Sequence, residues 1–346
     1  MTLRDKLPEI YHNLFPELLE LPFPKEKIAT CENCTLCRSK QSPYINTKCC
    51  TYHPHLANFL VGGILVDNQL QEGKTRILHQ IKDKVGVTPY GIIPSSAYVK
   101  REEILNSHAF WDKPKELAEA QLCPYFDKGD CSIWKYRENL CVTHFCSSIG
   151  GNAGKKFWKQ LNKYLKMAET DLSNYALLQL GWDPAEIKLN EVSDAKLKLS
   201  DEKDQLIEEN YDALWGEWKG KEAEFYIQCY EQIKTLNDAD FQRITGIKRA
   251  ILDQAIRESN TEFIANTLPD NLILNPNVQV KQLADNKLSL TANKEQVEIP
   301  ALIYPLIKAF NGERSTVEVF HLGFNILFNL TSTVDKLRQN NILITA

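Results

Sequence analysis

The stretch CPYFDKGDCSIWKYRENLCVTHFC, residues 123–146, holds four of the ten cysteines and dominates what the sequence says about the fold. Five more cysteines lie upstream in residues 31–50, so only Cys229 stands apart. Thiols that recur at short intervals let neighbouring turns direct several sulfur atoms to one point, as a soft metal requires. We therefore expect a thiolate-bound metal centre built from both groups. Its expected ligands are Cys31, Cys34, Cys37, Cys49, Cys50, Cys123, Cys131, Cys141 and Cys146.

The composition is that of a globular protein large enough for two domains or three small ones. The chain has 346 residues, 43% of them hydrophobic, and a formal net charge of −4, so bulk charge gives no reason to expect nucleic-acid binding. The sequence has no run of about 18 apolar residues, and its first residues lack the unbroken apolar core of a signal peptide. We therefore expect a cytoplasmic protein with no membrane partner. In that reducing compartment, clustered cysteines are expected to bind metal rather than form disulfides.

Hydrophobic periodicity predicts a mainly helical chain. An amphipathic helix is expected over residues 3–20, where Leu7, Leu14 and Leu18 recur at helical spacing. Further helices are expected over residues 56–68, 69–84, 154–180, 202–236 and 238–262, with two glycines interrupting the fourth of these. A core position is expected for the aromatic cluster of Trp215, Trp218, Phe225, Tyr226 and Tyr230.

The C-terminal residues change character. Residues 278–291 predict a hairpin that turns near Asp285-Asn286, followed by helices over 300–310, 315–324 and 331–339 and a strand at 342–344. The expected fold class is therefore mainly α with irregular Cys-rich metal-binding loops, together with a small α+β winged-helix-like C-terminal domain. The expected divisions are a Cys-rich metal-binding domain at 1–150, a helical domain packed on it at 151–265, and the winged-helix-like domain at 266–346.

The spacing of the first cysteine group favours an iron–sulfur cluster of the [4Fe–4S] type. Cys31, Cys34 and Cys37 are spaced to bind one face of a cubane cluster. The fourth ligand is then Cys49, Cys50 or a cysteine of the second group. Nine thiols suffice for two four-cysteine sites with one spare, or for one cluster and one zinc ion. Soft all-thiolate sites accept both metals, so zinc is the alternative cofactor.

Two further residues are expected to act on the cofactor. Arg137 lies among the second group of cysteines, where a guanidinium would offset the charge of an anionic cluster and donate hydrogen bonds to sulfur. The alternative is a surface ion pair with Glu138 or another acidic residue. His144 lies two residues before Cys146, where an imidazole is well placed to orient a ligand. Trp134, with the phenylalanine that follows His144, is expected to shield the centre from water.

The glycine-rich run GGNAGKK, residues 150–156, follows the last of these cysteines. It lacks the glycine and hydroxyl residue at the positions that a phosphate-binding loop requires. We expect it to turn the chain sharply and begin a helix, with anion binding at the free amides as the alternative. No nucleophile–base motif is present, and the sequence identifies no catalytic residue.

The cysteine segments resemble a known family. The elements CENCTLC (31–37), KCC (48–50), CPYF (123–126) and CSIWKYRENLC (131–141), closed by Cys146, are similar to those of the YkgJ-type cysteine-cluster proteins, a family of proposed zinc- or iron-chelating domains. Cys131, Ile133, Trp134 and Arg137 match the family pattern C-x-[IV]-[YW]-x-x-R. A more distant similarity to flagellin lysine N-methylases implies a role in modifying proteins. The sequence departs from the pattern in the eleven residues between the first triplet and the double cysteine.

The run PALIYPLIKAFNGERSTVEVF, residues 300–320, resembles the PqqD-type peptide-chaperone modules. That resemblance implies a protein or peptide partner for the C-terminal domain. DNA is an unlikely partner because the third expected helix, TSTVDKLRQNN, has just two basic residues.

Taken together, the residues and the resemblance favour a cytoplasmic metalloprotein with one or two iron–sulfur clusters, acting in redox chemistry or in protein or peptide modification. The alternatives are a partner-binding protein with structural zinc, and a metal-responsive regulator.

Overall fold

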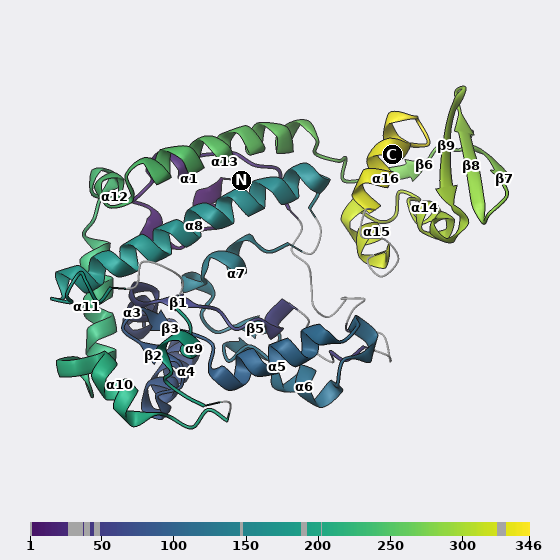
Figure 1. Ribbon diagram of the computed structural model, residues 1–346. Coiled ribbons are helices and arrows are strands. Elements are labelled where there is room, and N and C mark those ends of the chain that lie inside the picture. Colours follow the sequence, from purple (N-terminus) through teal and green to yellow (C-terminus); the bar gives the residue numbers. More distant parts are fainter. Residues whose placement is uncertain are drawn as a thin grey trace.

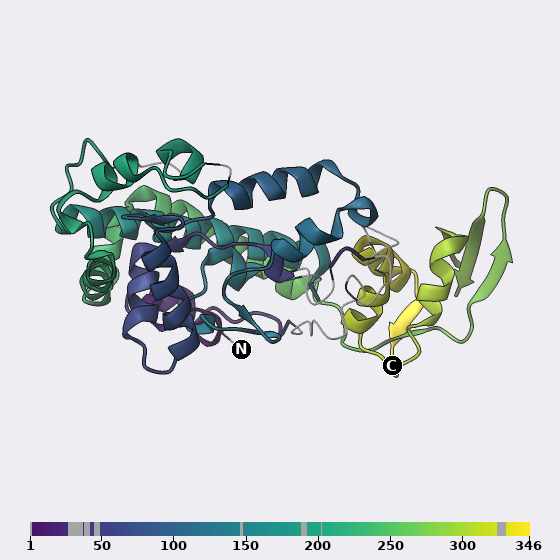
Figure 2. The ribbon, with the colours of Figure 1, turned by 90° about the horizontal axis from the view of Figure 1, so that it is seen from below.

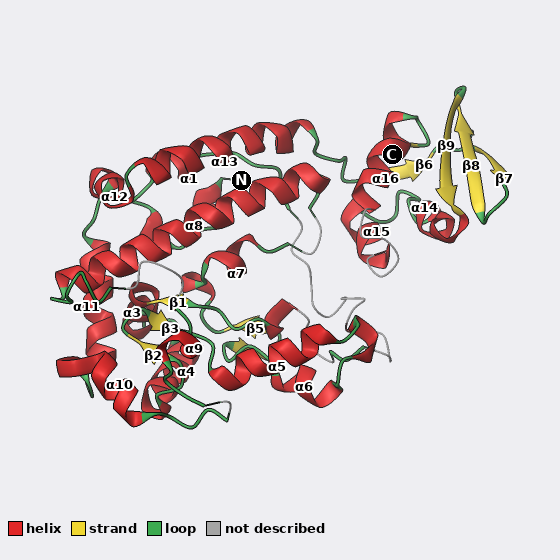
Figure 3. Ribbon diagram, viewed as in Figure 1, coloured by secondary structure: helices red, strands yellow, loops and turns green. Residues whose placement is uncertain are grey.

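The chain is mainly helical, with small antiparallel sheets, as the sequence predicts (Figure 3). The computed structural model describes residues 2–26, 37, 42–44, 49–145, 148–187, 192–201, 203–323 and 330–346. Cys31, Cys34 and Cys146, three of the expected ligands, lie outside these ranges. Within them, no helix is both long enough and apolar enough to cross a membrane.

Two long helices pack side by side along one side of the larger part of the molecule (Figure 1). Helix α8 (Gly151–Gln179) packs along α13 (Ile247–Ala265), and the backbone N–H of Leu268 donates to the carbonyl of Ile149, so the end of α13 meets the start of α8. The inward face of α8 includes Phe157, Leu161 and Leu172, which are fully buried. Helix α12 (Asp238–Thr245) precedes α13 and contacts α8.

A buried helix, α3 (Asn58–Val66), forms the second packing centre. It lies against α11 (Glu222–Lys234) so closely that a Cβ atom at Gly62 would be 1.9 Å from the carbonyl oxygen of Tyr226. Only glycine allows the two backbones to approach to this distance. A small three-stranded sheet adjoins α3. Its strands, in spatial order, are β1 (Leu56–Ala57), β3 (Gly91–Ile92) and β2 (Val87–Thr88). Helix α4 (Gln71–Asp83) also packs on α3.

The expected helix over residues 202–236 is broken. Helix α10 (Glu208–Trp215) ends at Gly216, a short 3-10 turn covers Gly216–Trp218, and α11 begins at Glu222. Both Gly216 and Gly220 have positive φ, a conformation that stops a helix. The expected aromatic core is confirmed for Trp215, Phe225 and Tyr226, which are buried, whereas the other two aromatic residues, at 218 and 230, are half-buried. The Trp215 indole donates to the carbonyl of Val87. The short helix α9 (Asp194–Leu197) lies upstream.

The expected continuous helix over residues 3–20 is wrong. Short 3-10 turns at Leu3–Asp5 and Glu9–Tyr11 are followed by α1 (Pro16–Leu19). Pro8 and Pro16 explain the breaks, because proline has no N–H to donate and disfavours helical geometry in the residue before it. The leucines at positions 7, 14 and 18 are still buried, so the apolar pattern marked core contact rather than one helix.

The cysteine-bearing segments lie on the opposite side of the molecule from α13 (Figure 1). They include a 3-10 turn (Cys49–Thr51), a hairpin of β4 (Phe126–Asp127) and β5 (Asp130–Cys131), a second turn (Trp134–Tyr136) and α7 (Asn139–Thr143). Helices α5 (Ser96–Ser107) and α6 (Lys115–Ala120), with a turn at Phe110–Asp112 between them, pack beside these segments.

The C-terminal elements agree with the expected pattern and lie at one end of the molecule (Figure 2). Strands β7 (Gln279–Gln282), β8 (Lys287–Ala292) and β9 (Glu295–Pro300) form an antiparallel meander, with Asp285 and Asn286 at the first turn in the left-handed region. A 3-10 turn (Ala301–Ile303) leads into α14 (Tyr304–Lys308), which is followed by α15 (Thr316–Gly323) and α16 (Leu330–Gln339). Strand β10 (Leu343–Thr345) pairs with β6 (Leu272–Leu274), which precedes the meander.

Candidate metal centre

The first and second cysteine groups meet at Cys50 and Cys123. The backbone N–H of Cys123 donates to the carbonyl of Cys50 at 2.7 Å, although the two residues are far apart in sequence. Tyr98 of α5 fixes the first segment, because its hydroxyl donates to the carbonyl of Thr51 at 2.8 Å and accepts from the backbone N–H of His53 at 3.0 Å. The contact between Cys50 and Cys123 therefore joins the second cysteine segment to a segment that α5 holds in place.

The β4–β5 hairpin carries Cys131 back toward Cys123. Phe126 pairs with Cys131 across the hairpin, and the N–H of Phe126 donates to the carbonyl of Cys123. The turn is closed by Lys128 and Gly129, both at positive φ. A two-residue turn of this kind matches the twist of the strands, so the local sequence itself brings the two cysteines together.

Cys141 lies in the first turn of α7, which a buried glutamate caps. The Glu138 carboxylate accepts from the backbone N–H of Leu140 at 2.8 Å and of Cys141 at 3.2 Å. It also accepts from the thiol of Cys141 and from the hydroxyl of Tyr52. This capping satisfies two backbone N–H groups in the first turn of α7. The Cys141 thiol lies near those of Cys123 and Cys131.

The thiols of these segments act on one another electrostatically. Burial, together with the neighbouring Cys131 and Cys50, raises the pKa of Cys123 to about 12. Burial also raises the pKa of Cys141, with Glu138, Cys123 and Cys131 adding to the effect. These effects, with the backbone bond between Cys123 and Cys50, place Cys50 of the first group near cysteines of the second group.

The described cysteines do not make up a complete set of metal ligands. Cys123, Cys131 and Cys141 form no disulfide. Within the described ranges, no three side chains among His, Cys, Asp and Glu are arranged closely enough to hold one metal ion. Cys49 is exposed, and Cys37 packs against a separate small apolar cluster that includes Tyr44.

Arg137 stacks on Trp134, and its charge lies near two of the thiols. Its guanidinium carbon lies 3.3 Å from the centre of the Trp134 ring, and its Nε donates to the Trp134 carbonyl at 3.0 Å. Burial lowers the pKa of Arg137, whereas Cys131 and Cys141 raise it, which places its charge near both thiols. The surface ion pair with Glu138 is absent from the described structure. Trp134 is 53% exposed, so the expectation that it shields the centre from water is wrong.

Sequence reasoning missed the buried carboxylates around the centre. Glu169 of α8 is buried, and it accepts from Asn139 at 2.6 Å and from Tyr11 at 3.3 Å. Burial and the neighbouring Glu138 raise its pKa well above the ordinary value. A third carboxylate, Glu26, is described below. The sequence offered a signal for Glu169 alone, because its apolar and aromatic neighbours place it on the inward face of α8.

The glycine-rich run is explained by packing. Gly151 has a φ of +58°, so it forms the sharp turn that was expected before the helix. A Cβ at Gly154 would lie 1.8 Å from the Ser148 hydroxyl, so glycine is needed there to let the chain fold back.

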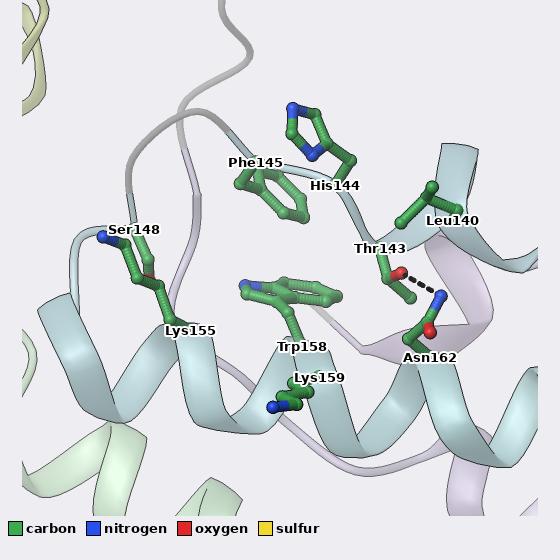
Figure 4. A pocket seen from close by; sticks show the side chains of 9 residues that line it. All are labelled: Leu140, Thr143, His144, Phe145, Ser148, Lys155, Trp158, Lys159 and Asn162. Atoms are coloured by element: carbon green, nitrogen blue, oxygen red, sulfur yellow. Dashed lines mark hydrogen bonds between the residues drawn. The ribbon is translucent and has the colours of Figure 1, made fainter. Parts of the chain in front are cut away.

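A cavity opens between α7, the residues that follow it, and the first turns of α8 (Figure 4). Its volume is about 210 Å³. His144, the second expected cofactor residue, is exposed and lines this cavity, two residues before Cys146.

No family model, curated protein or solved structure matches this chain. The similarity to the YkgJ-type proteins stays a prediction from the cysteine pattern.

Proposed function

We propose that this chain is a metalloprotein whose two cysteine groups together bind a soft metal centre. The observation that carries the proposal is the convergence of Cys50 with Cys123, Cys131 and Cys141, joined by the 2.7 Å backbone bond between the first two. A cytoplasmic site suits such thiols, since an oxidising compartment would convert neighbouring thiols into disulfides.

The donor set fits an all-thiolate centre. Neighbouring sulfurs are the ligands that iron–sulfur clusters and zinc prefer, and the described residues supply them from segments distant in sequence. Cys31, Cys34, Cys37, Cys49 and Cys146 are proposed as the other ligands. The triplet spacing favours [4Fe–4S], with zinc as the alternative. The same residues are too many for one ion, which supports a cluster or two separate centres.

The surrounding residues would control the charge of such a centre. Arg137 places a guanidinium near Cys131 and Cys141, where it offsets thiolate charge. Glu138 takes a hydrogen bond from Cys141 and occupies the free amides of α7. A bound cluster would supply electron transfer, and these groups would set how readily it is reduced.

The reaction class follows from the resemblance rather than from a catalytic constellation. We propose redox chemistry or modification of a protein or peptide. The C-terminal residues 266–346 would then act as a winged-helix-like module that contacts the partner. Their meander, three helices and closing strand support this assignment.

Metal analysis of protein purified without oxygen tests the proposal. A brown protein containing iron and acid-labile sulfide is expected, with broad visible absorption. A colourless protein containing zinc would reject the cluster but keep the thiolate centre. Protein that contains neither metal, and takes up neither after reconstitution, would refute the proposal.

Two variants make the test specific. Cys141→Ser should lower the metal content, because it removes one of the converging thiols. Cys229→Ser is the matched control, since Cys229 is buried in α11 within the apolar core and is not a proposed ligand. Equal metal content in both variants would contradict the assignment of Cys141.

A further inference from the structure

His53 is a buried histidine with one unused ring nitrogen. Its side chain belongs to a residue that is 7% exposed, and its Nδ1 lies 3.0 Å from the carbonyl oxygen of Pro54. A carbonyl can only accept a hydrogen bond, so this contact places the proton on Nδ1 and leaves a lone pair on Nε2. Among the residues that the structure describes, Nε2 has no hydrogen-bond partner. A histidine that served the core alone would be expected to use both nitrogens.

The imidazole of His53 is neutral at physiological pH. Burial lowers the pKa of His53 to about 4, although the hydrogen bond to Pro54 acts in the opposite direction. A neutral ring that donates from one nitrogen to a carbonyl and keeps a lone pair on the other is the form in which histidine binds metal ions. The hydrogen bond orients the ring and makes the second nitrogen a stronger donor to a metal.

His53 lies on the same side of the candidate metal centre as Cys123. Its ring contacts that of Tyr98 edge to face, with 5.3 Å between ring centres, and that of Tyr125 with 6.2 Å between ring centres. Burial raises the pKa of both tyrosines, and the nearby Cys123 adds to the effect in each. The imidazole and the Cys123 thiol therefore have two aromatic neighbours in common.

The chain also links His53 to Cys50. Two residues separate them, which is a spacing that paired ligands use in zinc sites. The Tyr98 hydroxyl fixes the segment between them, because it donates to the carbonyl of Thr51 and accepts from the N–H of His53. The carbonyl of Cys50 in turn accepts from the N–H of Cys123 at 2.7 Å. Backbone and side-chain hydrogen bonds thus hold the three residues in one unit.

We propose that His53 binds the metal through Nε2, together with Cys50 and Cys123. The inference rests on the proposed function and adds a nitrogen ligand to the thiols. In the described structure these three side chains do not form a closed ligand group, so binding requires them to rotate toward one another.

A nitrogen ligand suits a buried centre of this kind. An imidazole in place of a thiolate removes one negative charge from the site, where each uncompensated charge is costly. Less thiolate charge is then left for Arg137, the guanidinium near Cys131 and Cys141, to offset. In an iron–sulfur centre, the same replacement raises the reduction potential.

X-ray absorption spectroscopy of the full-length protein loaded with one equivalent of zinc tests the inference. Zinc is the probe because it accepts the same ligands, and because it binds nitrogen at about 2.0–2.1 Å but sulfur at about 2.3 Å. Scattering from the imidazole ring separates histidine nitrogen from oxygen. The wild type should show a mixed shell of sulfur and nitrogen. His53→Gln should lose nitrogen from this shell, whereas His53→Cys should bind zinc through sulfur alone.

Competition with a chelator gives a second readout. His53→Gln should bind zinc at least about tenfold more weakly, because loss of a group that merely orients a ligand already costs about 10–100-fold in affinity. His108→Gln is the matched control. The Nδ1 of His108 also contacts a carbonyl oxygen, that of Ile104 at 2.8 Å, but this side chain is exposed at the end of α5. The control should bind zinc as the wild type does, and thermal melting of the zinc-free proteins checks that all variants are folded.

Three outcomes would overturn the inference and leave the proposed metal centre standing. They are a wild-type shell that contains sulfur only, a nitrogen shell that is unchanged in His53→Gln, and equal zinc affinity of His53→Gln and the wild type. A wild-type protein that binds no zinc would refute the proposed centre and the inference with it. The wild-type spectrum needs no variant, so a His53→Gln protein that does not fold leaves this test intact.

Discussion

Replacing Glu26 tests how the two cysteine groups are held together. Glu26 is 2% exposed and lies five residues before Cys31. Its carboxylate accepts from the Ser148 hydroxyl, from the backbone N–H of Ile149 at 2.9 Å and from the indole N–H of Trp158 at 2.8 Å. Ser148 and Ile149 come shortly after Cys146, and Trp158 lies on α8, so one side chain joins the residues before the first cysteine group to those after the second.

The expected cost follows from the donors that lose their acceptor. Glu26→Ala leaves three buried donors unpaired, each worth about 1–3 kcal/mol, while the cost of burying a carboxylate is removed. A net loss of about 3–5 kcal/mol in the free energy of unfolding is expected. Glu26→Gln keeps one acceptor oxygen but turns an amide donor toward other donors, so it should lose about 1–2 kcal/mol.

Urea unfolding of the two variants measures these losses. Glu17→Ala, an exposed glutamate of the same N-terminal region, is the control and should change stability by less than about 0.5 kcal/mol. If Glu26 positions the cysteine segments, Glu26→Gln should also retain less metal than the control. A loss below about 1 kcal/mol for Glu26→Ala would refute the reasoning, because the three hydrogen bonds would then contribute almost nothing.

The stability that Glu26 contributes should depend on pH, and the direction of that dependence is a further test. Burial raises the pKa of Glu26 above 4.5, although its three hydrogen bonds act in the opposite direction. The folded protein therefore keeps this proton at pH values where the unfolded chain has lost it. Stability from this group is greatest below the unfolded pKa and is lost as pH rises through the folded pKa. The difference between wild type and Glu26→Gln should consequently shrink as pH rises above 4.5.

Three further substitutions have expected outcomes that urea unfolding can check. Gly62→Ala should destabilise the protein by about 1–3 kcal/mol or more, because the new Cβ would lie 1.9 Å from the Tyr226 carbonyl oxygen and force α3 away from α11. Asn237→Ala should cost about 1 kcal/mol, since it removes the side chain that accepts from the N–H of Asp240 at the start of α12. Cys229→Ala should cost about 1–2 kcal/mol by leaving a small void in the core, with no loss of metal.

The helices were predictable where periodicity and breakers agree. The helix expected over 154–180 is present as α8, and the hairpin at Asp285-Asn286 is present as β7–β8. Both depend on local signals that the sequence states directly. The helix expected over 3–20 is absent because apolar spacing alone predicts it and the prolines in this segment prevent it. Pro8 and Pro16 break it, and the leucines reach the core from short turns instead.

The sequence predicted which residue types form the candidate site, but it did not predict the buried glutamates that hold the surrounding segments in place. The clustered cysteines predict a thiolate-bound metal centre, and this stays a prediction; the structure shows that the backbone of Cys123 contacts that of Cys50. Nothing in the sequence singled out Glu26 or Glu138, because a glutamate beside apolar residues is equally common on a protein surface. Their roles depend on tertiary contacts with residues more distant than any motif spans, as the bond from Trp158 to Glu26 illustrates.

Burial of the converging thiols also determines how the metal-free protein behaves. With a pKa of about 12 for Cys123 and raised values for Cys131 and Cys141, these thiols stay protonated at neutral pH. A protonated thiol is a poor nucleophile and a poor metal ligand, so the centre resists oxidation and disulfide exchange until a cation replaces the protons. Metal uptake should therefore release protons and become more favourable as pH rises. The guanidinium of Arg137 alone is too little charge to stabilise several buried thiolates, so in the proposed centre the compensating charge would come from the metal.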